Sequence, residues 1–387
     1  MLIVISKKLK YLIGIILLIN LVIILSGKSF FYTALFKGYI FGNFTATLED
    51  YKYFHETSEI ISKNPVQWEK SKKFNSFEIT SNLKNYLEEN KSIAFIIIKS
   101  DSLIFERYWD IGSEKSLTNT FSVTKGIVTS LLGISIKEGY IGNINEKIIK
   151  YLPELKREGE SYNNQVTIKD LITMSSGLYW NENSFNPLGQ LAESYLTNNN
   201  LNFTLNLNFL EKPGEQFRYL SGNTMLLALL IQRATKKNIS SYTSEKLWTP
   251  LNSNYNALWS IDKDKSIEKG HCCFITNALD LARIGSLYLN NGVWKSEQIL
   301  DKKFVRESLN NGIVNHYSYS WRKFDKEFKY PVFCLTGLLG QYLILIPELR
   351  LIAVRLGHFQ KYDSLILPSD LKDYIIEIIS TDEKNKN

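Results

Sequence analysis

Cysteine and histidine are scarce in this chain, and their scarcity limits what the protein can be. The 387 residues include three cysteines (Cys272, Cys273 and Cys334) and four histidines (His55, His271, His316 and His358). An odd, low cysteine count argues against a disulfide framework, so we expect the cysteines to be packing residues. No Cys-x-x-Cys or His-Glu-x-x-His motif occurs, which argues against a zinc site. None of the histidines has a recognisable catalytic context.

Other absences narrow the classes of function. No Gly-x-Ser-x-Gly elbow is present, which argues against an α/β-hydrolase. The net charge is +7, but the lysines are scattered and form no dense basic block, so we expect no nucleic-acid binding. The hydrophobic share of 44% is ample for a sizeable core, and the length suits one large domain or two ordinary ones.

The N-terminus carries the one long apolar run. Three lysines at positions 7, 8 and 10 precede an apolar stretch from Tyr11 to Leu25. No Ala-x-Ala-like cleavage site follows, so we favour an uncleaved single-pass anchor over a cleaved signal peptide, which would give a secreted protein. With the lysines on the cytoplasmic side, the chain after about residue 30 is exported to the extracytoplasmic side of the cell membrane.

The remaining pattern predicts an α+β fold. Continuous apolar runs predict strands at Ser92–Lys99 and at Gln341–Ile346, near opposite ends of the chain. We expect both terminal blocks to form one antiparallel sheet, flanked by helices, with a mostly helical middle subdomain in which 181–208 is looped. The predicted organisation is an anchor or signal segment (1–30), a juxtamembrane linker (31–75), one folded domain (76–380) and a polar tail (381–387).

One stretch carries the candidate chemistry. Ser122 and Lys125 lie three residues apart at the start of an apolar helix, so they share one face of it. Burial is costly for a lysine unless it is paired or neutral, and a neutral amine beside a serine hydroxyl forms an activated nucleophile. Ser-x-x-Lys also occurs at five other places in the chain, but only this pair heads a long apolar helix.

Two further segments complete a possible acyl-transfer site. Tyr219-Leu220-Ser221 follows a Pro-Gly turn, and the Tyr219 phenol is suited to share a proton with Lys125. Gly337 to Gln341 precedes a strand, where a backbone N–H can face a substrate oxygen. On spacing alone, a structural tyrosine at Tyr219 and a simple turn at the glycines are the favoured interpretations.

The order of these elements resembles the serine β-lactamase and penicillin-binding protein superfamily. The resemblance is to its class C-like branch, which includes esterases, D-peptidases and 6-aminohexanoate-oligomer hydrolases. It rests on Phe121 to Lys125, Gly139 to Ile141, Tyr151 to Leu155, Val166 to Leu178, Pro213 to Asn223, Thr276 to Gly292 and Gly337 to Pro347.

The resemblance implies a role for each matching residue. Ser122 resembles the acylated nucleophile, Lys125 its general base and Tyr219 the proton relay to the leaving group. Ser221 matches a substrate contact that is often Asn, and Gly340 and Gln341 match the oxyanion segment. Leu338 stands where the family usually has a cationic or imidazole side chain, which argues against recognition of a substrate carboxylate and so against a true β-lactamase.

The implied activity is hydrolysis of a small-molecule or peptide-like ester or amide, without a metal or cofactor. A D,D-peptidase or penicillin-binding protein acting on peptidoglycan is an alternative enzyme. A non-catalytic binding protein on the same fold is an alternative of another class.

Overall fold

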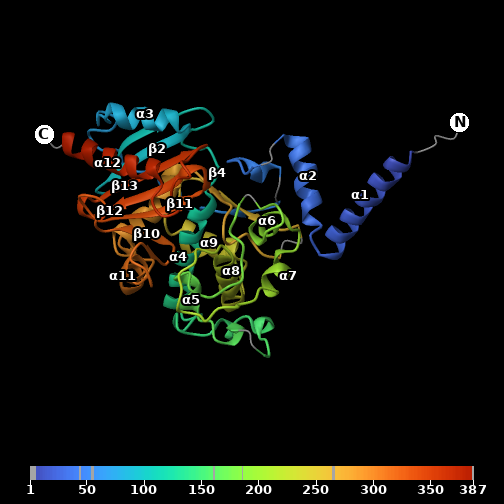
Figure 1. The fold of residues 1–387 in the computed structure, drawn as a ribbon. Helices are drawn as coiled ribbons and strands as arrows, with labels where there is room; N and C mark the ends of the chain where they lie inside the picture. The colour runs from blue at the N-terminus through green and yellow to red at the C-terminus, as the bar shows by residue number, and fades with distance from the viewer. Residues whose placement is uncertain are drawn as a thin grey trace.

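A seven-stranded antiparallel sheet organises the computed structural model (Figure 1). The structure describes residues 6–42, 45–53, 56–159, 162–184, 186–263 and 266–385, so His55 lies outside it. The strand order is β3-β2-β13-β12-β11-β10-β9. These strands are β2 (Ser92–Lys99), β3 (Ser102–Tyr108), β9 (Tyr317–Ser318), β10 (Trp321–Phe324), β11 (Val332–Gly337), β12 (Gln341–Ile346) and β13 (Leu351–Gly357). The sheet therefore joins the two terminal blocks, as predicted.

Both faces of the sheet are covered, which explains the continuous apolar runs. Successive side chains of a strand point to opposite faces. In β2, Ile96 and Ile98 belong to one core cluster, and Phe95 and Ile97 belong to the other. Helices α3 (Ser81–Glu89) and α12 (Ser369–Lys384) pack on the second face, where Figure 1 shows them side by side.

The other face carries the helical middle of the chain. It contains α4 (Thr124–Lys137), α5 (Ile168–Ile172), α6 (Gln190–Leu196), α7 (Asn200–Leu205), α8 (Gly222–Thr235), α9 (Ile239–Thr243), a π-helical turn (Ser244–Trp248), α10 (Ala278–Leu289) and α11 (Lys302–Asn310). Helix α10 packs on the sheet, while α4 contacts α8. The loop predicted for 181–208 is therefore wrong in part, because α6 and α7 lie within it.

A second, four-stranded sheet runs along this helical side in the order β1-β5-β6-β4. Its strands are β1 (Glu56–Ile60), β4 (Thr118–Asn119), β5 (Ala257–Ile261) and β6 (Phe274–Thr276), and a separate hairpin joins β7 (Val293–Trp294) to β8 (Glu297–Gln298). Strand β1 lies inside the segment predicted to be a linker. Residues 56–60 are thus built into the folded body, which the linker interpretation missed.

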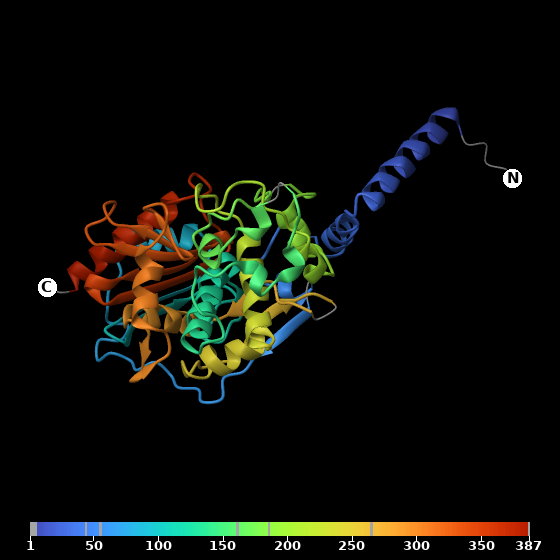
Figure 2. The ribbon, with the colours of Figure 1, turned by 90° about the horizontal axis from the view of Figure 1, so that it is seen from below.

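The two ends of the described chain are helical but pack differently. Helix α1 (Lys7–Leu25) has 19 residues with none buried, and it projects from the body (Figure 2). Its length and apolar composition suit a membrane span, as they also suit a signal sequence. Helix α2 (Phe30–Phe41) follows and packs against α6. At the other end α12 reaches Lys384 with Thr381 and Asp382 buried, so the predicted polar tail is largely helical.

Candidate active site

A strained turn presents Ser122 at the start of α4. Phe121 has a φ of 47°, which is unusual for a bulky residue, and its N–H donates to Asn119 Oδ1 at 2.8 Å. A short 3-10 turn, η2 (Phe121–Val123), then leads into α4. Phe121 and Val123 are buried in the core while Ser122 between them stays partly exposed. Ser122 is therefore held firmly but remains open to a ligand.

Lys125 is buried directly beside this serine. Its side chain lies one helical turn further on, in a residue that is 1% exposed. The Nζ atom is 2.8 Å from Ser122 Oγ and 2.9 Å from the backbone oxygen of His271. The next residue, Gly126, lets β11 approach, because a Cβ there would lie 2.3 Å from Leu335 Cδ1. The predicted Ser–Lys pair is thus formed.

The aromatic ring of Tyr219 lies next to Lys125. Its ring centroid lies 5.1 Å from Lys125 Nζ, within the range of a cation–π contact. Tyr317 packs edge-on against the same ring at 5.9 Å. The structure therefore brings Ser122, Lys125 and Tyr219 together, although the contact that it records for Tyr219 is through the ring.

Arg322 supplies a cation that the sequence interpretation did not find. Its guanidinium lies 5.7 Å from the Tyr219 ring centroid, and its Nε donates to Thr336 Oγ1 at 2.8 Å. Leu338 leaves the Gly337–Gln341 segment without a charged side chain. Arg322, which comes from β10, places a positive charge beside Tyr219. The argument against recognition of a carboxylate is weakened accordingly.

Glu182 holds Ser221 in place and is the second residue that the sequence did not reveal. Its carboxylate accepts from the Ser221 N–H at 2.7 Å and from the Ser221 hydroxyl at 2.6 Å. Burial raises the pKa of Glu182, while the positive charge of Lys125 and the bonds from Ser221 act in the opposite direction. An isolated glutamate in an Asn-rich stretch has no sequence signature, so only the fold could identify it.

The segment that begins at His271 contacts Lys125 through a backbone hydrogen bond. His271 is 2% exposed, and burial, with the charges of Lys125 and Lys269, holds its pKa well below the ordinary value. Cys272 and Cys273 are both buried, as predicted, but a disulfide joins them. The expectation of simple packing was therefore incomplete, and the covalent link sits next to the carbonyl that binds Lys125.

The third predicted element, Gly337 to Gln341, joins β11 to β12. The Gly340 N–H donates to Gln360 Oε1 at 2.9 Å, so this donor already has a protein partner. The Gln341 side chain bonds to the backbone oxygens of Leu338 and Gly357, while its backbone N–H stays a predicted oxyanion donor. The turn that carries Ser122 contacts both β12 and β11, and the pairing of β11 with β10 extends only to Cys334.

The next residues of β11 approach the nucleophile closely. At Gly337 a Cβ would lie 2.3 Å from the Thr120 carbonyl oxygen. The edge of β11 that pairs with β10 as far as Cys334 continues beside η2 at residues 335–337. The backbone of this stretch, like that of β12 beginning at Gln341, therefore lies beside the turn that carries Ser122.

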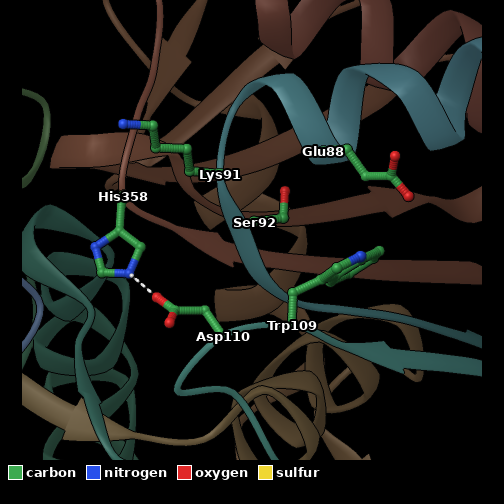
Figure 3. A pocket seen from close by; sticks show the side chains of 6 residues that line it. All are labelled: Glu88, Lys91, Ser92, Trp109, Asp110 and His358. Carbon is green, nitrogen blue, oxygen red and sulfur yellow. Dashed lines mark ion pairs between the residues drawn. The ribbon is translucent and has the colours of Figure 1, made fainter.

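A separate hollow of about 300 Å³ opens at the edge of the large sheet (Figure 3). It is lined by Glu88, Lys91, Ser92, Trp109, Asp110 and His358, and His358 Nε2 lies 3.2 Å from Asp110 Oδ2. These residues come from other elements than those around Ser122, so the hollow is not part of the Ser122 site.

Comparisons with known proteins identify the family of the chain. The Beta-lactamase family model matches residues 79–364. The 6-aminohexanoate-dimer hydrolase of Paenarthrobacter ureafaciens is 24% identical over 242 residues, which span 59% of this chain and 60% of that enzyme. This match thus leaves a substantial part of the enzyme's length uncovered.

Solved structures share the fold. A Bacillus anthracis protein, named provisionally as a 6-aminohexanoate-dimer hydrolase, superposes with a TM-score of 0.75 at 21% identity and covers 87% of this chain and 94% of its own. A family VIII carboxylesterase superposes with a TM-score of 0.61 at 15% identity, covering 82% and 99%. The family match spans most of the chain and includes every residue of the candidate site. The chain therefore belongs to the beta-lactamase family of hydrolases, with its fold of helices on an antiparallel sheet.

Proposed function

We propose that the protein is an exported, membrane-anchored serine hydrolase that cleaves an ester or amide through an acyl-enzyme on Ser122. The observation that carries the proposal is the distance of 2.8 Å between Ser122 Oγ and the buried Lys125 Nζ. A general base must lie within hydrogen-bond reach of the proton that it removes, and this pair satisfies that condition. Helix α1 supports the anchored location by its length and composition.

In the proposed reaction the Lys125 amine takes the hydroxyl proton while Ser122 Oγ bonds to the substrate carbonyl carbon. Backbone N–H groups of Ser122 and of residues 335–337 hold the oxyanion, and one such donor is typically worth about 3 kcal/mol. As the bond from the carbonyl carbon to the leaving group breaks, Tyr219 gives its phenol proton to the leaving alcohol or amine and regains a proton from Lys125. Water then attacks the acyl-enzyme, which releases the acid and restores the serine.

Glu182 and His271 are positioning residues in this scheme. Glu182 fixes Ser221, two residues beyond Tyr219, with two hydrogen bonds. The His271 carbonyl accepts from Lys125 Nζ and so directs the amine at the serine. The scheme requires no metal or cofactor.

Hydrolysis of short-chain p-nitrophenyl esters by the full chain in detergent tests the proposal. Ser122→Ala should abolish turnover. Ser135→Ala is the matched control, because Ser135 is buried on the same helix and bonds only to the Leu132 carbonyl. Turnover that persists unchanged in the Ser122→Ala variant would refute the assignment of the nucleophile.

A D,D-peptidase or penicillin-binding protein is the second candidate function, and Arg322 favours it. β-Lactams and D-alanyl peptides carry a carboxylate, and a guanidinium beside Tyr219 is suited to pair with one. Labelling with a fluorescent penicillin, compared between the wild type and Arg322→Gln, tests this function. Arginine-dependent labelling of Ser122 would favour the peptidase. The absence of an adduct with both penicillin and a fluorophosphonate would favour a non-catalytic binding protein.

A further inference from the structure

Exposed apolar side chains gather where the chain leaves its apolar helix. On α2, Leu35, Phe36 and Ile40 are exposed. On the loop that precedes α6, Tyr179 is 62% exposed and Leu188 is 43% exposed. We call Tyr179 and Leu188 the rim. Large apolar side chains left in water on a folded surface mark a contact with another apolar phase or partner.

The rim is tied to the end of α1. Lys28, three residues beyond Leu25, places its Nζ 2.5 Å from Glu193 on α6. A hollow of about 370 Å³ lies beside this pair, lined by Lys28, Tyr179, Trp180, Asn181, Asn186, Leu188, Gly189 and Gln190. Figure 1 shows α2 and α6 side by side at the base of α1. The rim and the start of the exported chain therefore share one surface.

The length of α1 fixes the level of that surface relative to a bilayer. Nineteen residues at about 1.5 Å each span about 28 Å, close to the hydrocarbon thickness of about 30 Å. Lys7, Lys8 and Lys10 stand in the first turn of this helix, and their side chains reach back to the cytoplasmic interface, so Leu25 ends near the outer boundary of the hydrocarbon. Lys28, in its ion pair with Glu193, then lies at the level of the lipid head groups. The rim, which borders the same hollow, lies at that level.

The same loop contacts the segment that carries Tyr219. Trp180 directly follows Tyr179 and packs on the start of α8, where a Cβ at Gly222 would lie 2.5 Å from its ring. Glu182, two residues further on, holds Ser221. One short segment thus contacts the hollow beside the anchor and the loop of Tyr219.

We propose that the substrate is a membrane-resident amphiphile, an ester or amide whose apolar tail stays in the outer leaflet while its carbonyl enters the Ser122 site across the rim. The inference rests on the proposed function and deepens it by naming the substrate class. The outer leaflet is what the rim contacts, because the length of α1 and the position of Lys28 place the rim at the leaflet whether or not a protein partner is present. Tyrosine is also well suited to the membrane–water boundary.

The test uses the full chain reconstituted in phosphatidylcholine vesicles. Two substrates share one scissile ester: p-nitrophenyl butyrate, which is soluble, and p-nitrophenyl palmitate, which resides in the bilayer. The variant is Tyr179→Ser combined with Leu188→Ser. The control is Ile376→Ser on α12, because Ile376 is 42% exposed on the opposite side of the large sheet.

The double variant should hydrolyse the palmitate ester about tenfold more slowly, since it loses two apolar contacts with the leaflet. Its turnover of the butyrate ester should stay within about twofold of the wild type, which also shows that it is folded. Ile376→Ser should change neither rate. Equal rates of palmitate hydrolysis in the variant and the wild type would overturn the inference and leave the rim to a protein partner.

An equal loss on both esters would also overturn the inference, because the rim would then act on the site itself. The proposed function stands in either case, provided that butyrate hydrolysis depends on Ser122. Failure of the wild type to hydrolyse either ester in a Ser122-dependent manner would refute the function and the inference together.

Discussion

The buried imidazole of His271 should make the protein lose stability in mild acid. His271 is 2% exposed, its Nδ1 has no hydrogen-bond partner among the described residues, and Nε2 lies 3.3 Å from Ser194 Oγ. Burial, together with the charges of Lys125 and Lys269, lowers its pKa well below 6.5 in the folded state. The ring therefore stays neutral in the folded protein and gains a proton when the chain unfolds.

The size of the effect follows from the unfolded state alone. Because the folded pKa is depressed, the unfolded chain binds more protons below about pH 6.5, and unfolding becomes easier as the pH falls. At about pH 5.5 an unfolded histidine is protonated about ten to one, which removes about 1.4 kcal/mol from the free energy of unfolding. At about pH 5 the loss is about 2 kcal/mol, and above about pH 7.5 it is negligible.

Comparison with His271→Gln isolates this contribution. Glutamine keeps an amide near Ser194 and keeps the backbone carbonyl that binds Lys125, but it does not titrate. Urea denaturation of both proteins in detergent, followed by tryptophan fluorescence between about pH 5 and pH 7.5, gives the two stability curves. The wild type should fall below the variant's trend by about 1.4 kcal/mol at about pH 5.5. Parallel curves would contradict a neutral, buried His271.

Three further substitutions test other contacts. Glu182→Ala removes the two hydrogen bonds to Ser221 and should lower kcat/KM about 10- to 100-fold, and Glu182→Gln should recover part of the loss. Equal rates in the wild type and both variants would contradict a positioning role. Gly126→Ala forces a methyl group into β11 and should cost about 1–3 kcal/mol of unfolding free energy in a denaturant titration; an unchanged midpoint would contradict the close packing. Asp280→Ala breaks the buried ion pair with Arg283 and should lower the free energy of unfolding by about 3–5 kcal/mol. Arg350→Ala breaks an exposed ion pair and should lower it by less than about 1 kcal/mol. Similar losses in the two variants would contradict the argument from burial.

The parts of the fold that the sequence predicted are those in which local pattern and burial agree. The strands at Ser92–Lys99 and Gln341–Ile346 have the predicted bounds, because a strand buried on both faces is apolar throughout. A capping box between Thr167 and Asp170 starts α5 and is a local signal of the same kind. Such signals depend on neighbouring residues alone.

The missed elements depend on contacts that the local pattern does not encode. Strand β1 has the polar sequence Glu-Thr-Ser-Glu-Ile and lies at the edge of its sheet, where it is paired only with β5. Helices α6 and α7 are short and lie in an Asn-rich stretch, and α7 begins where the Asn199 side chain accepts from Asn202 N–H. Polar composition alone therefore indicated a loop or linker in both places.

The same reason separates the predicted part of the site from the rest. Ser122 and Lys125 share a helix face, so their spacing was informative. Glu182 and Arg322 reach the site from a loop and from β10. A single charged residue forms no spacing pattern in the sequence, so neither residue could be predicted. The second oxyanion donor stays a prediction, because β11 and β12, which begins at Gln341, both contact η2 and local spacing does not distinguish them.

The order of strands in the large sheet also has a consequence for synthesis. Ile96 of β2 pairs with Val354 of β13, so two strands from opposite ends of the chain lie side by side near the middle of the sheet. Contacts between such distant segments form slowly, and β2 has only β3 as a partner until the ribosome has passed Gly357. A nascent chain that carries a largely apolar strand with one edge unpaired is prone to aggregate. We therefore expect the domain to depend on a holding chaperone until β13 is complete.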